Sequence, residues 1–165
     1  MTVQDRIASL LSATGATLSA AESCTGGRIS HLLTTVSGSS RWYLGSVTSY
    51  AASVKEKVLG VKAETISTFG IVSSEVAAAM AEGVRSLTGS TFAVATTGLA
   101  EGNNDRYPEG TVWIGVTGPL GTRTLLYQYN NGRKANIRRF SIRALHFLAE
   151  YIANCPSDCK SSKET

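Results

Sequence analysis

A lysine and several serines give this sequence the groups needed for nucleophilic attack on an amide. Ser40 precedes a predicted strand, Tyr50 is at the end of that strand, and Lys55 follows it. A serine hydroxyl needs a base before it attacks a carbonyl carbon. The two histidines, His31 and His146, fall inside helical patterns, so lysine is the available base. A lysine amine is neutral near pH 7 only where it is desolvated or placed beside other cations.

Tyr50 and Lys55 bracket one helical turn, which could bring the phenol and the amine toward the same pocket. On the residues alone, a plainer interpretation is favoured. Lys55 would be a solvated helix residue beside Glu56 and Lys57, and Tyr50 would pack at the end of a strand.

Two further polar clusters follow predicted strands, where open α/β sheets usually bind their ligands. The first, 22–27, combines hydroxyls and glycines at a helix start and could cradle a phosphate or a carboxylate. Such turns are also common helix entries. The second, 96–100, could offer backbone N–H groups to a ligand or an oxyanion, or be a plain strand exit. Cys24 has no evident histidine to form a thiolate, so we expect a small buried thiol.

The composition excludes several classes of protein. Of the 165 residues, 42% are hydrophobic and 17% are charged, a globular balance that excludes disorder of the body of the chain. No apolar run reaches the length of a membrane span, and the first residues lack the apolar core of a signal peptide. We therefore expect a cytoplasmic protein with no membrane partner.

The net charge and the cysteines restrict the kinds of ligand that we expect. The net charge of +4 could serve to bind a small anionic ligand or simply to keep the protein soluble. Because no recognised nucleic-acid-binding motif accompanies the charge, no nucleic-acid partner is expected. Three cysteines in a cytosolic chain argue against a disulfide framework, and two histidines leave a structural metal without ligands.

Hydrophobic periodicity predicts helices that alternate with strands, followed by a hairpin. Helices are expected at 3–12, around 29–33, and at 51–59, 61–69, 74–87 and from 134 on; strands are expected at 17–21, 42–50, 91–96, 111–117 and 122–129. This order predicts a three-layer α/β/α sandwich with a mixed sheet and a C-terminal antiparallel hairpin. We expect one domain over 1–155 and a polar tail, 156–165, that frays. The alanine-rich segment 76–81 could pair two copies into a homo-oligomer.

Motifs along the chain resemble those of the CinA C-terminal domain family, the nicotinamide mononucleotide deamidases. Residues 21–27 read AESCTGG, which looks like the hallmark of that family. The resemblance extends in order over about residues 5–152 and includes further matching segments: Gly38-Ser39-Ser40, Tyr50 with Lys55, Gly70-Ile71-Val72-Ser73, Thr97-Gly98-Leu99-Ala100 and Gly110-Thr111-Val112-Trp113.

The resemblance implies an amidohydrolase that converts nicotinamide mononucleotide to nicotinate mononucleotide and ammonia in pyridine-nucleotide recycling. It implies Ser40 as the nucleophile, Lys55 as the base and Tyr50 as an orienting or proton-passing group, with Ser23 as the rival nucleophile. No metal and no cofactor are implied. The expected substrate-binding residues are Ser23, Thr25, Gly26, Thr97 and Gly98, with Arg133 or Lys134 holding the phosphate.

The sequence departs from the family pattern at two places near the expected substrate. The glycine-rich continuation after Ala100 is replaced by a charged segment, 101–106, and a Gly-Asp-Arg motif becomes Gly132-Arg133-Lys134. Carboxylates in that loop would face a phosphate poorly. The departures keep an alternative open, a degenerate paralogue that binds a pyridine nucleotide or a protein partner without turnover. A third option is an amidase for another carboxamide.

Overall fold

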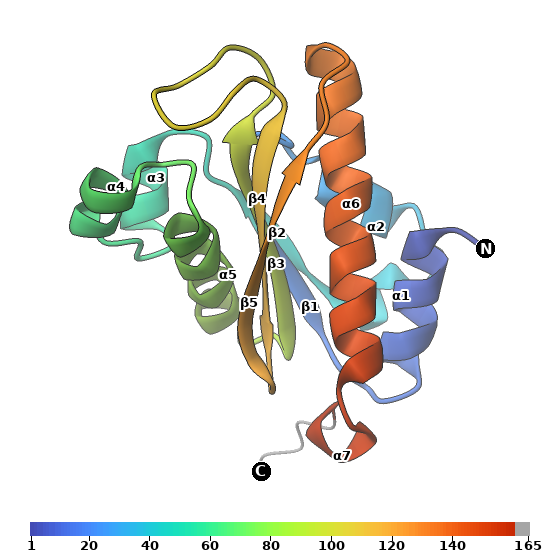
Figure 1. Ribbon diagram of the computed structural model, residues 1–165. Coiled ribbons are helices and arrows are strands. Elements are labelled where there is room, and N and C mark those ends of the chain that lie inside the picture. Colours follow the sequence, from blue (N-terminus) through green and yellow to red (C-terminus); the bar gives the residue numbers. More distant parts are fainter. Residues whose placement is uncertain (161–165) are drawn as a thin grey trace.

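The computed structural model describes residues 1–160 and contains a five-strand mixed sheet in the order β2-β1-β3-β4-β5 (Figure 1). The first three strands in that order are parallel, and β4 and β5 run antiparallel to their neighbours. The strands are β1 (Leu18–Glu22), β2 (Tyr43–Thr48), β3 (Phe92–Leu99), β4 (Thr111–Gly118) and β5 (Gly121–Gln128).

Helices cover both faces of the sheet, which makes three layers (Figure 1). One face packs against α1 (Val3–Ser12), α2 (Arg28–Thr34) and α6 (Arg133–Asn154), and the other against α5 (Ser74–Thr88), with α3 (Ala52–Lys57) and α4 (Ala63–Phe69) alongside. The remaining elements are a 3₁₀ turn, η1 (Ser39–Arg41), and a short terminal helix, α7 (Ser157–Lys160). The predicted α/β/α sandwich with a mixed sheet is confirmed.

Two apolar clusters form the core, one on each face of the sheet. Phe140, Leu145 and Leu148 of α6 are fully buried together with Ile7 of α1 on the first face. Met80 of α5 belongs to the cluster on the second face. The side chains of an inner strand point alternately toward the two apolar clusters. All of β1 and most of β3 are therefore buried, as expected for strands covered on both sides.

The structure refines the expected boundaries of these elements. β3 continues through Leu99 instead of ending at Thr96, because its last residues pair with the start of β4. The expected antiparallel hairpin is formed by β4 and β5, and α6 follows it. Within the expected frayed tail, α7 is helical; 161–165 lie outside the described residues.

The alanine-rich segment of α5 is buried on one side. Val76, Ala77, Met80 and Ala81 are fully buried within one chain against the sheet, whereas Ala78 and Ala79 are partly exposed. Pairing of two copies through this segment stays a prediction. Among the described residues, no helix combines the length and the apolar character required to cross a bilayer.

Gly115 lets the α5 backbone lie directly on β4. A Cβ at this position would sit 2.5 Å from the carbonyl oxygen of Ala77 and 2.8 Å from its carbonyl carbon. Both contacts are with helix backbone, which cannot swing aside as a side chain would. We expect Gly115→Ala to lower the free energy of unfolding by about 1–3 kcal/mol or more, measured by urea denaturation. An unchanged midpoint would show that the two layers are not in contact here.

Candidate functional site

The amine of Lys55 is buried beside a serine hydroxyl at one edge of the sheet. The Lys55 side chain is fully buried, and its Nζ donates hydrogen bonds to Ser23 Oγ at 2.8 Å and to the carbonyl oxygen of Ser49 at 2.5 Å. Burial lowers the pKa of Lys55 from 10.5 to about 8. A lysine in this setting can give up its proton near neutral pH, as a general base requires.

The parallel strands explain why these groups meet. Ser23 directly follows β1 and Ser49 directly follows β2, and the two strands are parallel neighbours. Their carboxyl ends therefore reach the same edge of the sheet, where the Ser49 N–H donates to the Glu22 carbonyl oxygen at 2.7 Å. The chain then turns into α3, whose first turn brings Lys55 back over both residues.

Ser40 lies at the other end of β2 from Lys55. It belongs to η1 before the strand and is exposed, whereas Lys55 follows the strand. A strand of six residues spans roughly 20 Å. The expected pair of Ser40 and Lys55 is therefore not formed. Ser23, the rival nucleophile, is the serine that contacts the lysine.

The turn after Ser23 binds a carboxylate of the protein itself. The buried side chain of Glu22 accepts hydrogen bonds from the backbone N–H of Ile29 at 2.8 Å and of Ser30 at 3.0 Å. It also accepts one from the Thr25 hydroxyl at 2.7 Å. These N–H groups are the ones a phosphate would have used at the start of α2. The expectation that this turn cradles a ligand anion is therefore wrong for these groups.

Thr25 and Gly26 are structural. Thr25 is almost fully buried, and its hydroxyl is also within 2.8 Å of the Thr96 hydroxyl on β3. Gly26 adopts a positive φ of 61°, a backbone conformation that glycine tolerates and other residues rarely adopt. Neither residue lines the pocket described below, so their expected contacts with substrate are corrected.

A cavity of about 180 Å³ opens beside the serine–lysine pair. Its wall includes Ser23, Tyr50, Thr97, Gly98, Glu101 and Arg133. Among the expected substrate-binding residues, the structure thus brings Ser23, Thr97, Gly98 and Arg133 together. Lys134, the alternative phosphate ligand, instead lines a separate groove with Arg28, Ile137 and Arg138.

The end of β3 forms one rigid wall of this cavity. The Thr97 hydroxyl donates to the carbonyl oxygen of Ile71 at 2.7 Å and so holds the segment before α5 against the strand. A Cβ at Gly98 would lie 2.5 Å from the carbonyl oxygen of Thr111, so the close approach of β3 and β4 requires glycine there.

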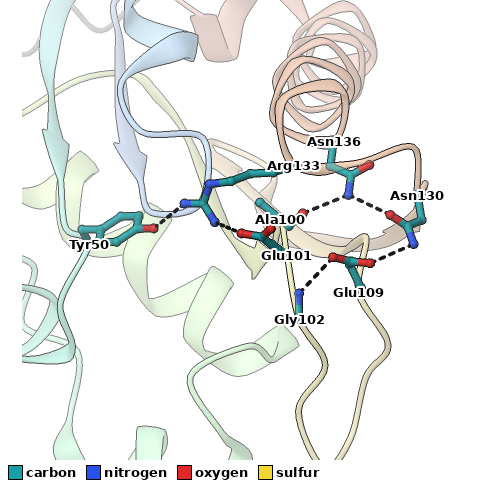
Figure 2. Close-up of polar contacts among 8 residues, drawn as sticks. All are labelled: Tyr50, Ala100, Glu101, Gly102, Glu109, Asn130, Arg133 and Asn136. Carbon is teal, nitrogen blue, oxygen red and sulfur yellow. Dashed lines mark hydrogen bonds and ion pairs between the residues drawn. The ribbon is translucent and has the colours of Figure 1, made fainter.

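The mouth of the cavity carries a cation held by two neighbours (Figure 2). Arg133 donates to the Tyr50 hydroxyl at 3.0 Å and forms an ion pair with Glu101 at 3.4 Å. All three side chains are exposed to solvent; that of Tyr50 is 62% exposed. Tyr50 is therefore at the site, and its hydroxyl accepts a hydrogen bond from Arg133, 83 residues later in the sequence.

Cys24 also lines the cavity, and its side chain is buried, as expected. Burial raises the pKa of its thiol to about 12, which keeps the thiol neutral at ordinary pH. Among residues 1–160, no three metal-ligating side chains of His, Cys, Asp or Glu lie close enough together to share an ion.

Sequence reasoning missed the residue that fixes the loop beside the cavity. Asn136 is fully buried, and its amide nitrogen donates to the Ala100 carbonyl oxygen at 2.9 Å and to the Asn130 side chain at 3.1 Å (Figure 2). Glu109 continues the network by accepting from Asn130 and from the Gly102 N–H. An asparagine on the apolar stripe of a predicted helix was the available signal, because buried amides are placed where they find partners.

Fold and site together define an α/β/α domain with a buried serine–lysine pair at the carboxyl edge of its parallel strands. The model of the CinA C-terminal domain family matches residues 1–152, so the chain belongs to that family. The chain is 44% identical over 147 residues to a CinA-like protein from Salinibacter ruber, an alignment that covers 88% of this chain and 36% of the relative. It spans little more than a third of the length of such curated relatives.

Solved structures support the same relationship. The competence damage-inducible protein A from Klebsiella pneumoniae superposes with a TM-score of 0.90 at 30% identity, covering 93% of this chain and 97% of that chain. A competence/damage inducible protein from Agrobacterium tumefaciens gives a TM-score of 0.85 at 32% identity, covering 92% and 94%.

Burial of the Lys55 amine should cost stability. The folded protein loses the Lys55 proton near pH 8, whereas the unfolded chain keeps it to pH 10.5, so stability rises with pH across that window. We expect Lys55→Met to raise the free energy of unfolding at pH 7 by about 1–3 kcal/mol, because an apolar side chain replaces a buried charge. The gain should shrink between pH 8 and pH 10.5, measured by urea denaturation at several pH values. A destabilised variant at pH 7 would contradict this account.

Proposed function

We propose that this chain is an amidohydrolase that converts nicotinamide mononucleotide to nicotinate mononucleotide and ammonia. The observation that carries the proposal is the 2.8 Å hydrogen bond between Lys55 Nζ and Ser23 Oγ, at a buried amine whose pKa is about 8. A serine with an adjacent base is the arrangement that amide hydrolysis through a covalent intermediate requires. The family resemblance supplies the substrate.

The proposed nucleophile is Ser23 in place of Ser40, because it is the hydroxyl that contacts the base. Neutral Lys55 takes the proton of the Ser23 hydroxyl as Oγ attacks the carboxamide carbon. The resulting ammonium then protonates the amide nitrogen, the C–N bond breaks and ammonia leaves. Water attacks the acyl ester with Lys55 again as the base, which releases the nicotinate product and restores the Ser23 hydroxyl.

The Ser49 carbonyl oxygen has a defined part in this cycle. It accepts one N–H of Lys55 at 2.5 Å, which fixes the direction of the amine. With one N–H so held, the lone pair of the neutral amine can point at Ser23 and receive its proton. Because the accepting group is a carbonyl and carries no full negative charge, it stabilises the ammonium less than a carboxylate would and leaves the pKa low.

The other end of the substrate would lie at the mouth of the cavity. Arg133 lines the same cavity as Ser23, and its planar guanidinium matches the geometry of a phosphate. Tyr50 is bonded to Arg133, so its proposed part is to orient this cation and border the substrate. Lys134 is not proposed as a ligand, since it lines a different groove.

Substitution of either member of the pair should abolish turnover. We expect Ser23→Ala and Lys55→Met each to lower kcat for ammonia release from nicotinamide mononucleotide by roughly 10²-fold or more, since each removes a group that takes part in bond making. Ammonia can be measured by a coupled assay and folding by circular dichroism. Ser40→Ala is the matched control, because it truncates a serine at the far end of β2, and it should keep wild-type turnover.

The two serine variants also separate the rival assignments. Loss of activity in Ser40→Ala with full activity in Ser23→Ala would overturn the proposed nucleophile. If the wild-type protein binds the mononucleotide in calorimetry but releases no ammonia, the non-catalytic alternative stands instead.

The activity should follow the ionisation of Lys55. Only the neutral amine accepts a proton, so kcat/KM should rise about tenfold per pH unit below pH 8 and level off above it. At pH 7 roughly one tenth of the enzyme would carry the reactive amine. A pH–rate profile that is flat between pH 6 and pH 9 would exclude Lys55 as the base.

A further inference from the structure

Glu101 places a negative charge on the cation that would hold the phosphate. Its carboxylate forms an ion pair with the Arg133 guanidinium at 3.4 Å, drawn in Figure 2. Both side chains line the cavity that also contains Ser23. The second terminal nitrogen of Arg133 donates to Tyr50 at 3.0 Å. Two of the five N–H donors of Arg133 are therefore engaged, so an incoming phosphate must share this guanidinium with the Glu101 carboxylate or displace it.

The backbone on each side of this ion pair is held by hydrogen bonds, whereas the two side chains are exposed to solvent. Asn136, one turn into α6 from Arg133, holds the Ala100 carbonyl oxygen just before Glu101 at 2.9 Å. The Arg133 and Glu101 side chains are 46% and 64% exposed. Ion pairs exposed to solvent contribute little to stability, so a phosphate dianion can compete with this carboxylate.

The loop itself holds Glu101 close to the cavity. Glu109 accepts the Gly102 N–H at 3.1 Å, and Arg106 donates to the carbonyl oxygens of Phe69 and Thr68 at the end of α4. The loop is therefore anchored at both ends and near its middle. A substrate can push the Glu101 side chain aside, but the anchored backbone keeps its carboxylate at the cavity.

Resting on the proposed function, we propose that Glu101 sets the substrate specificity of this site by competing with the phosphate of the substrate for Arg133. The charge weakens binding of every phosphate-bearing ligand and leaves ligands without a phosphate unaffected. It thereby narrows the advantage of a mononucleotide over the corresponding riboside. Glu101 is a specificity-determining residue and takes no part in the chemistry at Ser23.

The test compares Glu101→Gln with the wild-type protein by isothermal titration calorimetry, using nicotinate mononucleotide and nicotinate riboside as probes. Removal of the carboxylate charge should tighten the mononucleotide about threefold to tenfold and leave the riboside unchanged. The gain should shrink in high salt and vanish when Arg133 is also changed to Gln. Glu150→Gln is the matched control, because it neutralises another exposed acid that pairs with an arginine, Arg143, on α6, and it should change neither affinity.

The outcomes distinguish this proposal from the proposed function. If Glu101→Gln weakens both probes equally, Glu101 binds the ribose hydroxyls and the competition is refuted. Unchanged mononucleotide affinity, or no mononucleotide binding by either protein, also refutes it. If the tightening is seen but no ammonia forms from nicotinamide mononucleotide, the amidase function fails while the role of Glu101 stands.

Discussion

Desolvation of one amine is the constraint around which the site is built. Lys55 is a fully buried lysine, and neither recorded hydrogen-bond acceptor of its Nζ is a carboxylate. An ammonium in that position is poorly compensated, since a hydroxyl and a carbonyl oxygen replace water but do not neutralise the charge. The protein therefore holds the amine closer to its neutral form. The same burial that lowers stability also lowers the pKa of the amine and so raises the fraction of neutral amine near pH 7.

The acidic residue next to Ser23 in the sequence does not neutralise the Lys55 ammonium. The nearest acid in sequence to Ser23 is Glu22, and its carboxylate is turned to the start of α2, where two backbone N–H groups and the Thr25 hydroxyl bind it. A helix N-terminus is a good partner for an anion because of its unpaired N–H groups and dipole. Glu22 thus supports the AESCTGG turn while being kept away from Lys55. In this respect the motif has a structural role, and it places the Ser23 hydroxyl beside the Lys55 amine.

Much of the fold could be predicted from the sequence, because local signals mark its helices and strands. These signals are hydrophobic periodicity, glycines that end helices, and the Ser73 N-cap of α5. The residues of the candidate site were harder to predict from the sequence. Ser23 and Ser40 are both serines beside strands, and residue type alone does not separate them. The parallel arrangement of β1 and β2 does: Ser23 follows its strand and Ser40 precedes its own. The contact of Glu101 with Arg133 joins a loop to a helix start 32 residues later, and neither local pattern nor spacing predicts such a pairing.

The two ends of the site therefore differ in their exposure to solvent, and this difference changes how strongly charges interact there. Around Lys55 the groups are buried, so distances are fixed by packing and each polar atom must find its partner within the protein. Around Arg133 the groups are exposed, water screens their charges, and exchanging one anion for another costs little. Substitutions at the mouth can therefore change which ligand binds without disturbing the buried pair. This is where the chain departs from the pattern of its family, in the charged 101–106 segment and at Gly132-Arg133-Lys134, while Ser23 and Lys55 retain it. The separation explains how a site can keep one reactive centre while its recognition of substrate varies.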